Sequence, residues 1–331
     1  MKDCEKLNYP TIPTEWKKST WQLILRGKEL GGNENKMQEI RLAQEGDVDR
    51  QKEIWQLCFG DPVSYIDFYY SNRYKNAETA VLLHKGEIAA MLTMMPVRTV
   101  RPDNCSFRTS MIYAIATDPQ HQNKGFATQL IDFSDQYLRD CQTELSVLVP
   151  ANAQLFDYYR RQGYRSGFYI KETQLSSHDV DRLPVSRQCT CSIKSITPQE
   201  YNWRRNNQLK GRFYISYPDE DIVYQKKLSL LSGADIYAID IEDIKGCLAV
   251  ERISPDKVLI KELLLPEDYI YLAIKQILQF AAASEYIFRT PPYLGEHLRG
   301  TLRPFGMFKR HIKSDWIIPP GNLGYLGFAF D

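Results

Sequence analysis

The sequence has no surplus of charge of either sign and no long apolar run. Its 42 basic residues are balanced by 41 acidic residues, so no global basic field is available to recruit nucleic acid or an anionic membrane. No apolar segment approaches the roughly 20 residues that span a bilayer, and the N-terminus lacks the apolar core of a signal peptide. We therefore expect a cytoplasmic protein that binds neither nucleic acid nor membrane.

A disulfide framework is also absent. The seven cysteines are an odd number scattered along the chain, which fits reduced thiols. The closest pair, Cys189 and Cys191, has neither a second cysteine pair nor a nearby histidine to complete a set of four ligands. The sequence therefore predicts no metal site.

The length of 331 residues is comfortable for two domains, each able to bury its own core. Residues 1–36 contain prolines and glycines without a sustained period, so we expect an N-terminal extension outside the fold. Residues 177–187 are rich in turn-forming and polar residues and are expected to link a first domain, 37–176, to a second, 188–331.

Strand and helix patterns alternate along the first domain, and part of the second domain repeats them in a weaker form. This alternation predicts an α/β fold with a mixed sheet. The expected strands are 39–43, 79–84, 88–95, 106–117, 145–149, 236–241, 246–253 and 257–265, and the expected helices are 47–58, 61–74, 124–139, 152–162 and 269–284.

The most informative segment is the polar turn between the strand 106–117 and the helix after it. Gly125 and the small Ala127 allow backbone to approach a ligand closely. The helix would direct its unpaired N–H groups and the positive end of its dipole back at the turn. Such a turn suits a pyrophosphate, although the turn alone is also compatible with an ordinary surface loop.

Two signatures carry a resemblance to a known family. Read as Gln122-x-x-Gly125-x-Ala127, the turn resembles the acyl-CoA signature of the GCN5-related N-acetyltransferases (GNAT). After the next strand, Tyr159-Arg-Arg-Gln-Gly-Tyr164 is similar to the family's second signature, at the end of a helix. The chain looks like the tandem type, with two GNAT-like domains of which the second is degenerate.

The resemblance implies roles for individual residues. Backbone groups of the turn would hold the pyrophosphate of acetyl-CoA, and those of the preceding strand would hold its pantetheine arm and thioester carbonyl. Tyr159 would donate a proton to the departing thiolate, since phenol and thiol pKa values are suitably close, while Tyr158 is expected to pack the helix against the sheet. The residues expected to contact acetyl-CoA are Ile115, Ala116, Thr117, Gln122, Asn123, Lys124, Gly125, Phe126, Ala127, Thr128 and Asn152.

The general base is harder to predict. Asp118 adjoins the turn and reads as a cap, whereas Tyr113 could line the acceptor pocket or belong to the core. The chain ends in an apolar tail from Tyr325 to Asp331, with two carboxylates at its end. Acetyltransferases of the enhanced-intracellular-survival type, which this shorter chain resembles, use a C-terminal carboxylate as base. The resemblance thus implies Asp331, and a last strand of the second domain is the alternative.

In the second half, the counterpart of the turn is 264–268, which has no glycine and carries two carboxylates that would repel a pyrophosphate. We therefore expect one acetyl-CoA site in an N-acetyltransferase that acts on a primary amine of a small molecule, by direct attack in a ternary complex. The alternatives are an acyl-CoA-binding regulatory protein without turnover and a tandem-GNAT aminoacyl transferase. Neither the acceptor nor the oligomeric state follows from the sequence.

Overall fold

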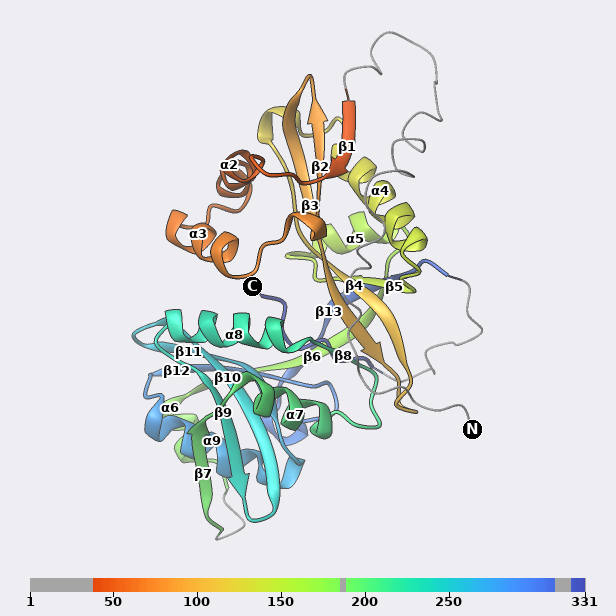
Figure 1. Ribbon diagram of the computed structural model, residues 1–331. Coiled ribbons are helices and arrows are strands. Elements are labelled where there is room, and N and C mark those ends of the chain that lie inside the picture. Colours follow the sequence, from red (N-terminus) through yellow and green to blue (C-terminus); the bar gives the residue numbers. More distant parts are fainter. Residues whose placement is uncertain (1–37, 185–188, 313–322, 331) are drawn as a thin grey trace.

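The structure is a computed structural model that describes residues 38–184, 189–312 and 323–330. Within these residues, 13 strands form one continuous mixed sheet, with helices packed against it (Figure 1). The sheet order is β1-β2-β3-β4-β5-β13-β6-β12-β11-β10-β9-β7, and β8 pairs with β3. The predicted α/β fold with a mixed sheet is confirmed. No helix of the described part is long and apolar enough to cross a membrane.

The first half contains six strands that surround the predicted turn. Its elements are β1 (Gln38–Leu42), α2 (Val48–Phe59), α3 (Val63–Asn72), η3 (Asn76–Glu78), β2 (Thr79–His84), β3 (Glu87–Val100), β4 (Ser106–Thr117), η4 (Pro119–His121), α4 (Phe126–Asp140), β5 (Leu145–Leu148), α5 (Ala153–Arg161) and β6 (Arg165–Ser176). Lys85 and Gly86 join β2 to β3 with positive φ angles of 56° and 86°, as a tight hairpin turn requires. On α4, Phe126, Leu130 and Leu138 form a buried apolar stripe that faces the sheet.

The second half supplies the remaining elements. They are α6 (Ser177–Asp181), β7 (Cys191–Ser195), α7 (Pro198–Gln208), β8 (Tyr214–Ser216), α8 (Asp219–Leu231), β9 (Ile236–Ile241), β10 (Ile244–Ser254), β11 (Lys257–Leu264), η5 (Glu267–Tyr269), α9 (Ile270–Phe280), β12 (Glu285–Thr290), η6 (Glu296–Leu298) and β13 (Thr301–Arg310). The helix α6 lies in the segment that we expected to be a linker. A capping box formed by Ser176 and Asp179 begins α6, and Val180 anchors it in the core.

Strands cross between the halves. β13, from the end of the second half, lies between β5 and β6 and pairs antiparallel with both. In turn β6, the last strand of the first half, pairs with β12 of the second half through residues 171–176. The short strand β8 adds to the edge of β3. The two halves are therefore joined by shared backbone hydrogen bonds as well as by side chains.

The largest apolar core also spans both halves. It includes Trp55 and Tyr69 from the first half and Tyr201, Tyr224 and Phe328 from the second, each at most 2% exposed. Separate cores lie between the sheet and α4 in the first half, and between the sheet and α9 in the second. Residues 324–330 are thus part of a common interior rather than a surface tail. Residues 1–36, predicted as an extension, lie outside the described residues.

Candidate active site

The two central parallel strands of the first half separate at their carboxyl ends. The ladder between β4 and β5 runs from Thr109 opposite Leu145 to Met111 opposite Val147. β4 then continues to Thr117 while it pairs with β3 on its other side. We call this divergence the first fork. Beyond it, β4 has no pairing with β5 among the described residues, and the carbonyl of Thr117 accepts hydrogen bonds from Cys58 at 3.1 Å and from Gln122 at 3.2 Å.

A β-bulge bends β4 at the first fork. The register with β3 shifts between Met91 and Thr93, and Ala114 adopts a left-handed backbone with φ 49°. A bulge sets two residues of one strand against one of its partner and re-aims the strand beyond that point. The predicted contact residues Ile115, Ala116 and Thr117 come directly after it. Their side chains are buried or half-buried.

The turn after β4 leads straight into the N-terminus of α4. Asp118 accepts the N–H of Gln120 at 2.8 Å and pairs with the guanidinium of Arg50. Burial alone would raise the pKa of Asp118, but these two contacts hold it below its ordinary value. Asp118 is therefore an ionised turn residue, as its sequence position suggested, and both of its carboxylate oxygens are already engaged within the protein. Sequence reasoning did not identify Arg50, because it lies on α2, far from the motif.

The N-terminus of α4 fits a pyrophosphate. Gly125 is the N-cap, with φ 77° and no side-chain cap, and Asn123 before it has φ 62°. The N–H groups of the first turn, including that of Ala127, therefore have no intrahelical partner. A Cβ placed on Gly125 would meet no atom within 4 Å, so the approach to these groups is open. Lys124 is exposed beside them and could add positive charge.

Two side chains join α4 to α5 beside this turn. Tyr158 and Thr128 share a hydrogen bond of 3.3 Å between their hydroxyl oxygens, and Gln162 donates to the Thr128 hydroxyl at 3.3 Å. Asn152 caps α5 by accepting the N–H of Leu155 at 3.0 Å. The side chain of Asn152 is thus already engaged within its own helix, and its contact with acetyl-CoA stays a prediction.

The two tyrosines of α5 differ from expectation in their packing. We expected Tyr158 to pack the helix against the sheet, but Tyr158 is only half-buried and Tyr159 is 8% exposed, within the core that holds α4 and α5. Tyr159 also makes an edge contact with Tyr164, with ring centroids 5.9 Å apart. Burial raises the pKa of Tyr159, and the neighbouring Tyr158 adds to the shift. This shift moves the pKa of Tyr159 further above that of a thiol, so the close match expected from the sequence is not kept. Tyr159 stays protonated at neutral pH and cannot act as a base there.

The tail of the chain, which we define as residues 324–330, ends beside the bulge of β4. The carbonyl oxygen of Phe330 accepts hydrogen bonds from Tyr113 on β4 at 3.0 Å and from Tyr65 on α3 at 3.3 Å. Phe330 is buried, and its ring contacts that of Tyr224 on α8. Figure 1 places this end of the chain between α3 and α8. Asp331, the predicted base, comes directly after Phe330 in sequence but lies outside the described residues.

The second half has a corresponding pair of parallel strands that diverge, and a carboxylate connects the loops that follow them. β11 and β12 pair in parallel from Lys257 to Ile260 before they separate, and β11 also carries a register shift there. The turn after β11 contains Glu267, whose carboxylate accepts the N–H groups of Gly295 at 2.7 Å and Glu296 at 3.0 Å. An acidic side chain thus ties this turn to the loop after β12. The arrangement has no counterpart in the first fork.

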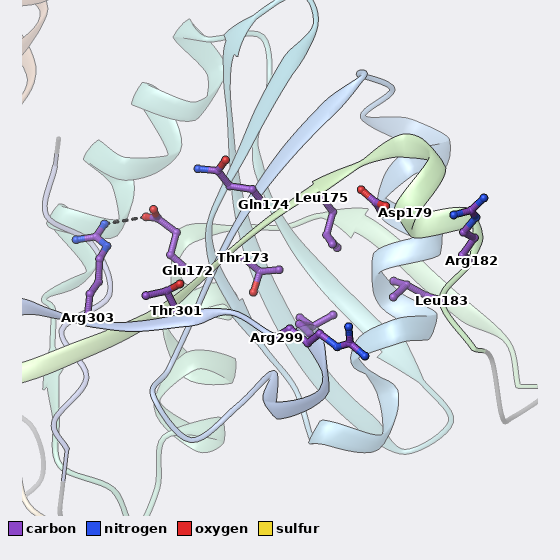
Figure 2. Close-up of a pocket in the computed structure, with 11 residues that line it drawn as sticks. Glu172, Thr173, Gln174, Leu175, Asp179, Arg182, Leu183, Arg299, Thr301 and Arg303 are labelled. Carbon is purple, nitrogen blue, oxygen red and sulfur yellow. Dashed lines mark hydrogen bonds and ion pairs between the residues drawn. The ribbon is translucent and has the colours of Figure 1, made fainter.

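A pocket of about 840 Å³ lies elsewhere, between the end of β6, the α6 segment and residues 298–303 (Figure 2). Its lining includes none of the residues predicted to contact acetyl-CoA. Glu172 is shared by Arg303 at 2.7 Å and Arg289 at 3.2 Å, so its charge is neutralised within the protein. The residues that line the pocket are Glu172, Thr173, Gln174, Leu175, Asp179, Arg182, Leu183, Leu298, Arg299, Thr301 and Arg303.

Comparisons with known proteins agree with this geometry. Residues 39–167 match a family model described as an acetyltransferase (GNAT) domain. A search of curated proteins by sequence gave no match to the chain.

Among solved structures, a GCN5-related N-acetyltransferase from Anabaena variabilis is similar with a TM-score of 0.66, at 15% identity over 83% of this chain and 73% of that chain. Eis1 from Mycobacterium abscessus gives a TM-score of 0.63, at 12% identity over 82% of this chain and 74% of that chain. At such low identities these similarities show a shared fold, and they extend over both halves.

Proposed function

The chain belongs to the GNAT superfamily, and we propose that it transfers an acetyl group from acetyl-CoA to a primary amine of a small-molecule acceptor. The enzyme class, an acyltransferase, follows from the matched domain. The choice of acetyl donor, amine acceptor and direct attack in a ternary complex is our proposal. We also propose that the protein works in the cytoplasm, where its seven cysteines stay reduced.

One observation supports this function above all others. The first fork leaves backbone groups of β4 unpaired by β5, and the uncapped N-terminus of α4 lies directly after that strand. An extended amide arm can hydrogen-bond to the strand edge while a pyrophosphate lies at the helix N-terminus, where N–H groups and dipole favour anions. We propose as contacts Ile115, Ala116, Thr117, Gln122, Asn123, Lys124, Gly125, Phe126, Ala127, Thr128 and Asn152.

The proposed chemistry uses two protein groups. Acetyl-CoA supplies the activated thioester, and the acceptor amine needs to lose a proton before it attacks. We propose that the carboxylate of Asp331 takes that proton, and the supporting observation is that Phe330, the residue before it, is held beside β4 by Tyr65 and Tyr113. Tyr159 then protonates the departing thiolate. No covalent enzyme intermediate is required.

We further propose a division of labour between the halves. Residues 37–176 would carry acetyl-CoA, and residues 188–331 would wall the acceptor site and supply the base. Residues 177–187 would connect them. The supporting observation is that the described end of the chain lies between α3 of the first half and α8 of the second.

A melting curve and a turnover assay test the proposal together. Saturating acetyl-CoA should raise the melting temperature, because a ligand that binds only the folded state stabilises it. Thiol release with a panel of small amines should then identify the acceptor. Binding without release for any amine would favour a regulatory acyl-CoA-binding protein, and an unchanged melting curve would remove the acetyl-CoA site altogether.

Substituting Tyr159→Phe should lower kcat about a hundredfold and leave the affinity for acetyl-CoA within about twofold, since general acid catalysis contributes at least that much. Single-turnover kinetics and calorimetric titration would measure the two effects. Tyr158→Phe is the matched control on the same helix, because its hydroxyl contacts Thr128 instead. Equal turnover of the Tyr159→Phe variant and the natural enzyme would exclude Tyr159 as the acid.

A further inference from the structure

A fully buried ion pair lies in the second half, away from the first fork. Arg205 on α7 and Glu262 on β11 both have side chains with no exposed surface. The Arg205 Nε atom is 3.1 and 3.0 Å from the two carboxylate oxygens of Glu262. Tyr201 donates a further hydrogen bond to Glu262 at 2.7 Å. Burying two charges carries a large desolvation penalty, so such a pair is weak evidence for stability by itself.

The remaining donors of Arg205 bind backbone carbonyls. Nη1 donates to Ile215 at 2.7 Å, and Nη2 donates to Leu326 of the tail at 3.1 Å. The guanidinium also lies over the rings of Tyr217 and Phe328, 5.1 and 5.7 Å from their centroids. A single side chain therefore connects α7, β11, β8 and the tail.

The tail backbone packs directly on this pair. Gly327 has φ 81°, and a Cβ built there would overlap Glu262 Oε1 and lie 2.7 Å from Arg205 Nη2. Only glycine satisfies both the left-handed backbone and the contact. The ion pair and the path of the tail are thus fitted to one another at this residue.

Hydrogen bonds to alternate carbonyls continue along the tail. Tyr217 donates to Phe328 at 2.5 Å and also lies 3.1 Å from the carbonyl of Leu326. The next alternate carbonyl, that of Phe330, is held by Tyr65 and Tyr113 from the first half. The second half therefore fixes the middle of the tail, and the first half receives its end beside the bulge of β4.

We propose that Arg205 and Glu262 are positioning residues that hold the tail so that Phe330 lies beside β4 at the first fork. They act through Leu326, Gly327 and Phe328. The inference rests on the proposed function in one respect, namely that Asp331, the residue after the tail, is the base. Arg204 provides the contrast, since this neighbour on α7 pairs with Asp240 at 2.8 Å and has no recorded contact with the tail within the described residues.

Release of C-terminal residues by a carboxypeptidase tests the position of the tail without any assay of activity. Glu262→Gln and Gly327→Ala should each speed the release of Phe330 about tenfold at a temperature well below melting, since local opening governs such cleavage. Asp240→Asn is the matched control and should leave the rate unchanged. If Glu262→Gln does not fold, the double variant R205M/E262L removes both charges while it keeps apolar packing. Unchanged release in Gly327→Ala and in a folded variant of the pair would overturn the proposal.

Kinetics then separate this inference from the proposed function. Glu262→Gln should lower kcat about tenfold and leave the KM for acetyl-CoA within about twofold. In a chain that lacks Phe330 and Asp331, the same substitution should leave kcat unchanged, because effects through a shared element are not additive. An equal loss of kcat in the full and shortened chains would show that the pair acts on the fold alone, and would refute the inference. Faster release of Phe330 with unaltered kcat would support the positioning role and assign the base elsewhere.

Discussion

Gly125 combines a left-handed backbone with an open space where a side chain would project. Most non-glycine residues pay about 1 kcal/mol to adopt such a backbone. The open space is also where a pyrophosphate would approach the N–H groups of α4. A substitution at Gly125 therefore has two separable consequences, one for stability and one for binding.

We predict that Gly125→Ala weakens acetyl-CoA binding about tenfold and lowers the free energy of unfolding by about 1 kcal/mol. Calorimetric titration and urea unfolding measure the two quantities. Gly211 has the same φ of 77° and equally open surroundings, so Gly211→Ala is a matched control for backbone strain. Similar affinity losses in both variants would place the pyrophosphate elsewhere.

His311, next to the end of β13, links stability to pH. Its side chain is fully buried, and burial lowers its pKa to about 4, with Lys309 and Arg139 adding to the effect. Between the unfolded pKa of about 6.5 and the folded value, the unfolded state binds the proton and the native state does not. This contribution to stability is present above pH 6.5 and is lost as pH falls toward 4.

Lowering the pH from 7 to 5 should thus reduce the free energy of unfolding by up to about 2 kcal/mol through His311 alone. Urea unfolding at both pH values measures the change. His311→Gln should remove most of this pH dependence, whereas His178→Gln, at an exposed position, should retain it. A pH dependence that persisted in His311→Gln would assign it to other groups.

At the scale of elements, local patterns predicted the first half well. The expected strand 106–117 matches β4 in both bounds, and the helices before and after it agree within a few residues. Apolar periodicity and turn residues act over a few positions, so they are visible in the sequence. The turn at Gly125 and the beginning of α4 could be predicted from such local signals.

Elements that bury polar groups were missed. α7 buries Arg204 and Arg205, and α8 buries Asp221, so neither helix shows an apolar stripe. These charges are tolerated because their partners come from distant parts of the chain. β13 contains Pro304 and a bulge beside it, both of which weaken a strand pattern.

The candidate site also has one part that local sequence predicts and another that depends on distant contacts. The first fork and the bulge at Ala114 depend on strand register, and the path of the tail depends on contacts with Tyr65 and Arg205. Neither is encoded by neighbouring residues. Tyr113 was identified as a candidate at the acceptor pocket, but no sequence signal indicated Tyr65.

The two forks yield a prediction about stoichiometry. Glu267 ties the second turn to Gly295 and Glu296, and its negative charge opposes a pyrophosphate there. Calorimetric titration should therefore give one acetyl-CoA per chain, and Gly125→Ala should affect that single site. A second saturable site that survived Gly125→Ala would contradict the assignment.

At the scale of the whole molecule, the insertion of β13 between β5 and β6 makes the first half incomplete on its own. We predict that residues 37–176 expressed alone aggregate, because the edges of β5 and β6 would be left unpaired. Co-expression with residues 177–331 should restore a soluble complex, measured by gel filtration. A monomeric first half that binds acetyl-CoA would show that β13 is dispensable.

The exchange of strands also sets an order of events during synthesis. A ribosome makes chains from the N-terminus, and domains usually fold as they emerge. Here the sheet around the first fork must wait for β13, and the tail that ends beside it comes later still. Pairings between distant segments form slowly, so the nascent chain spends this interval with exposed strands. Chains cut short before β13 would therefore lack a complete sheet around the first fork.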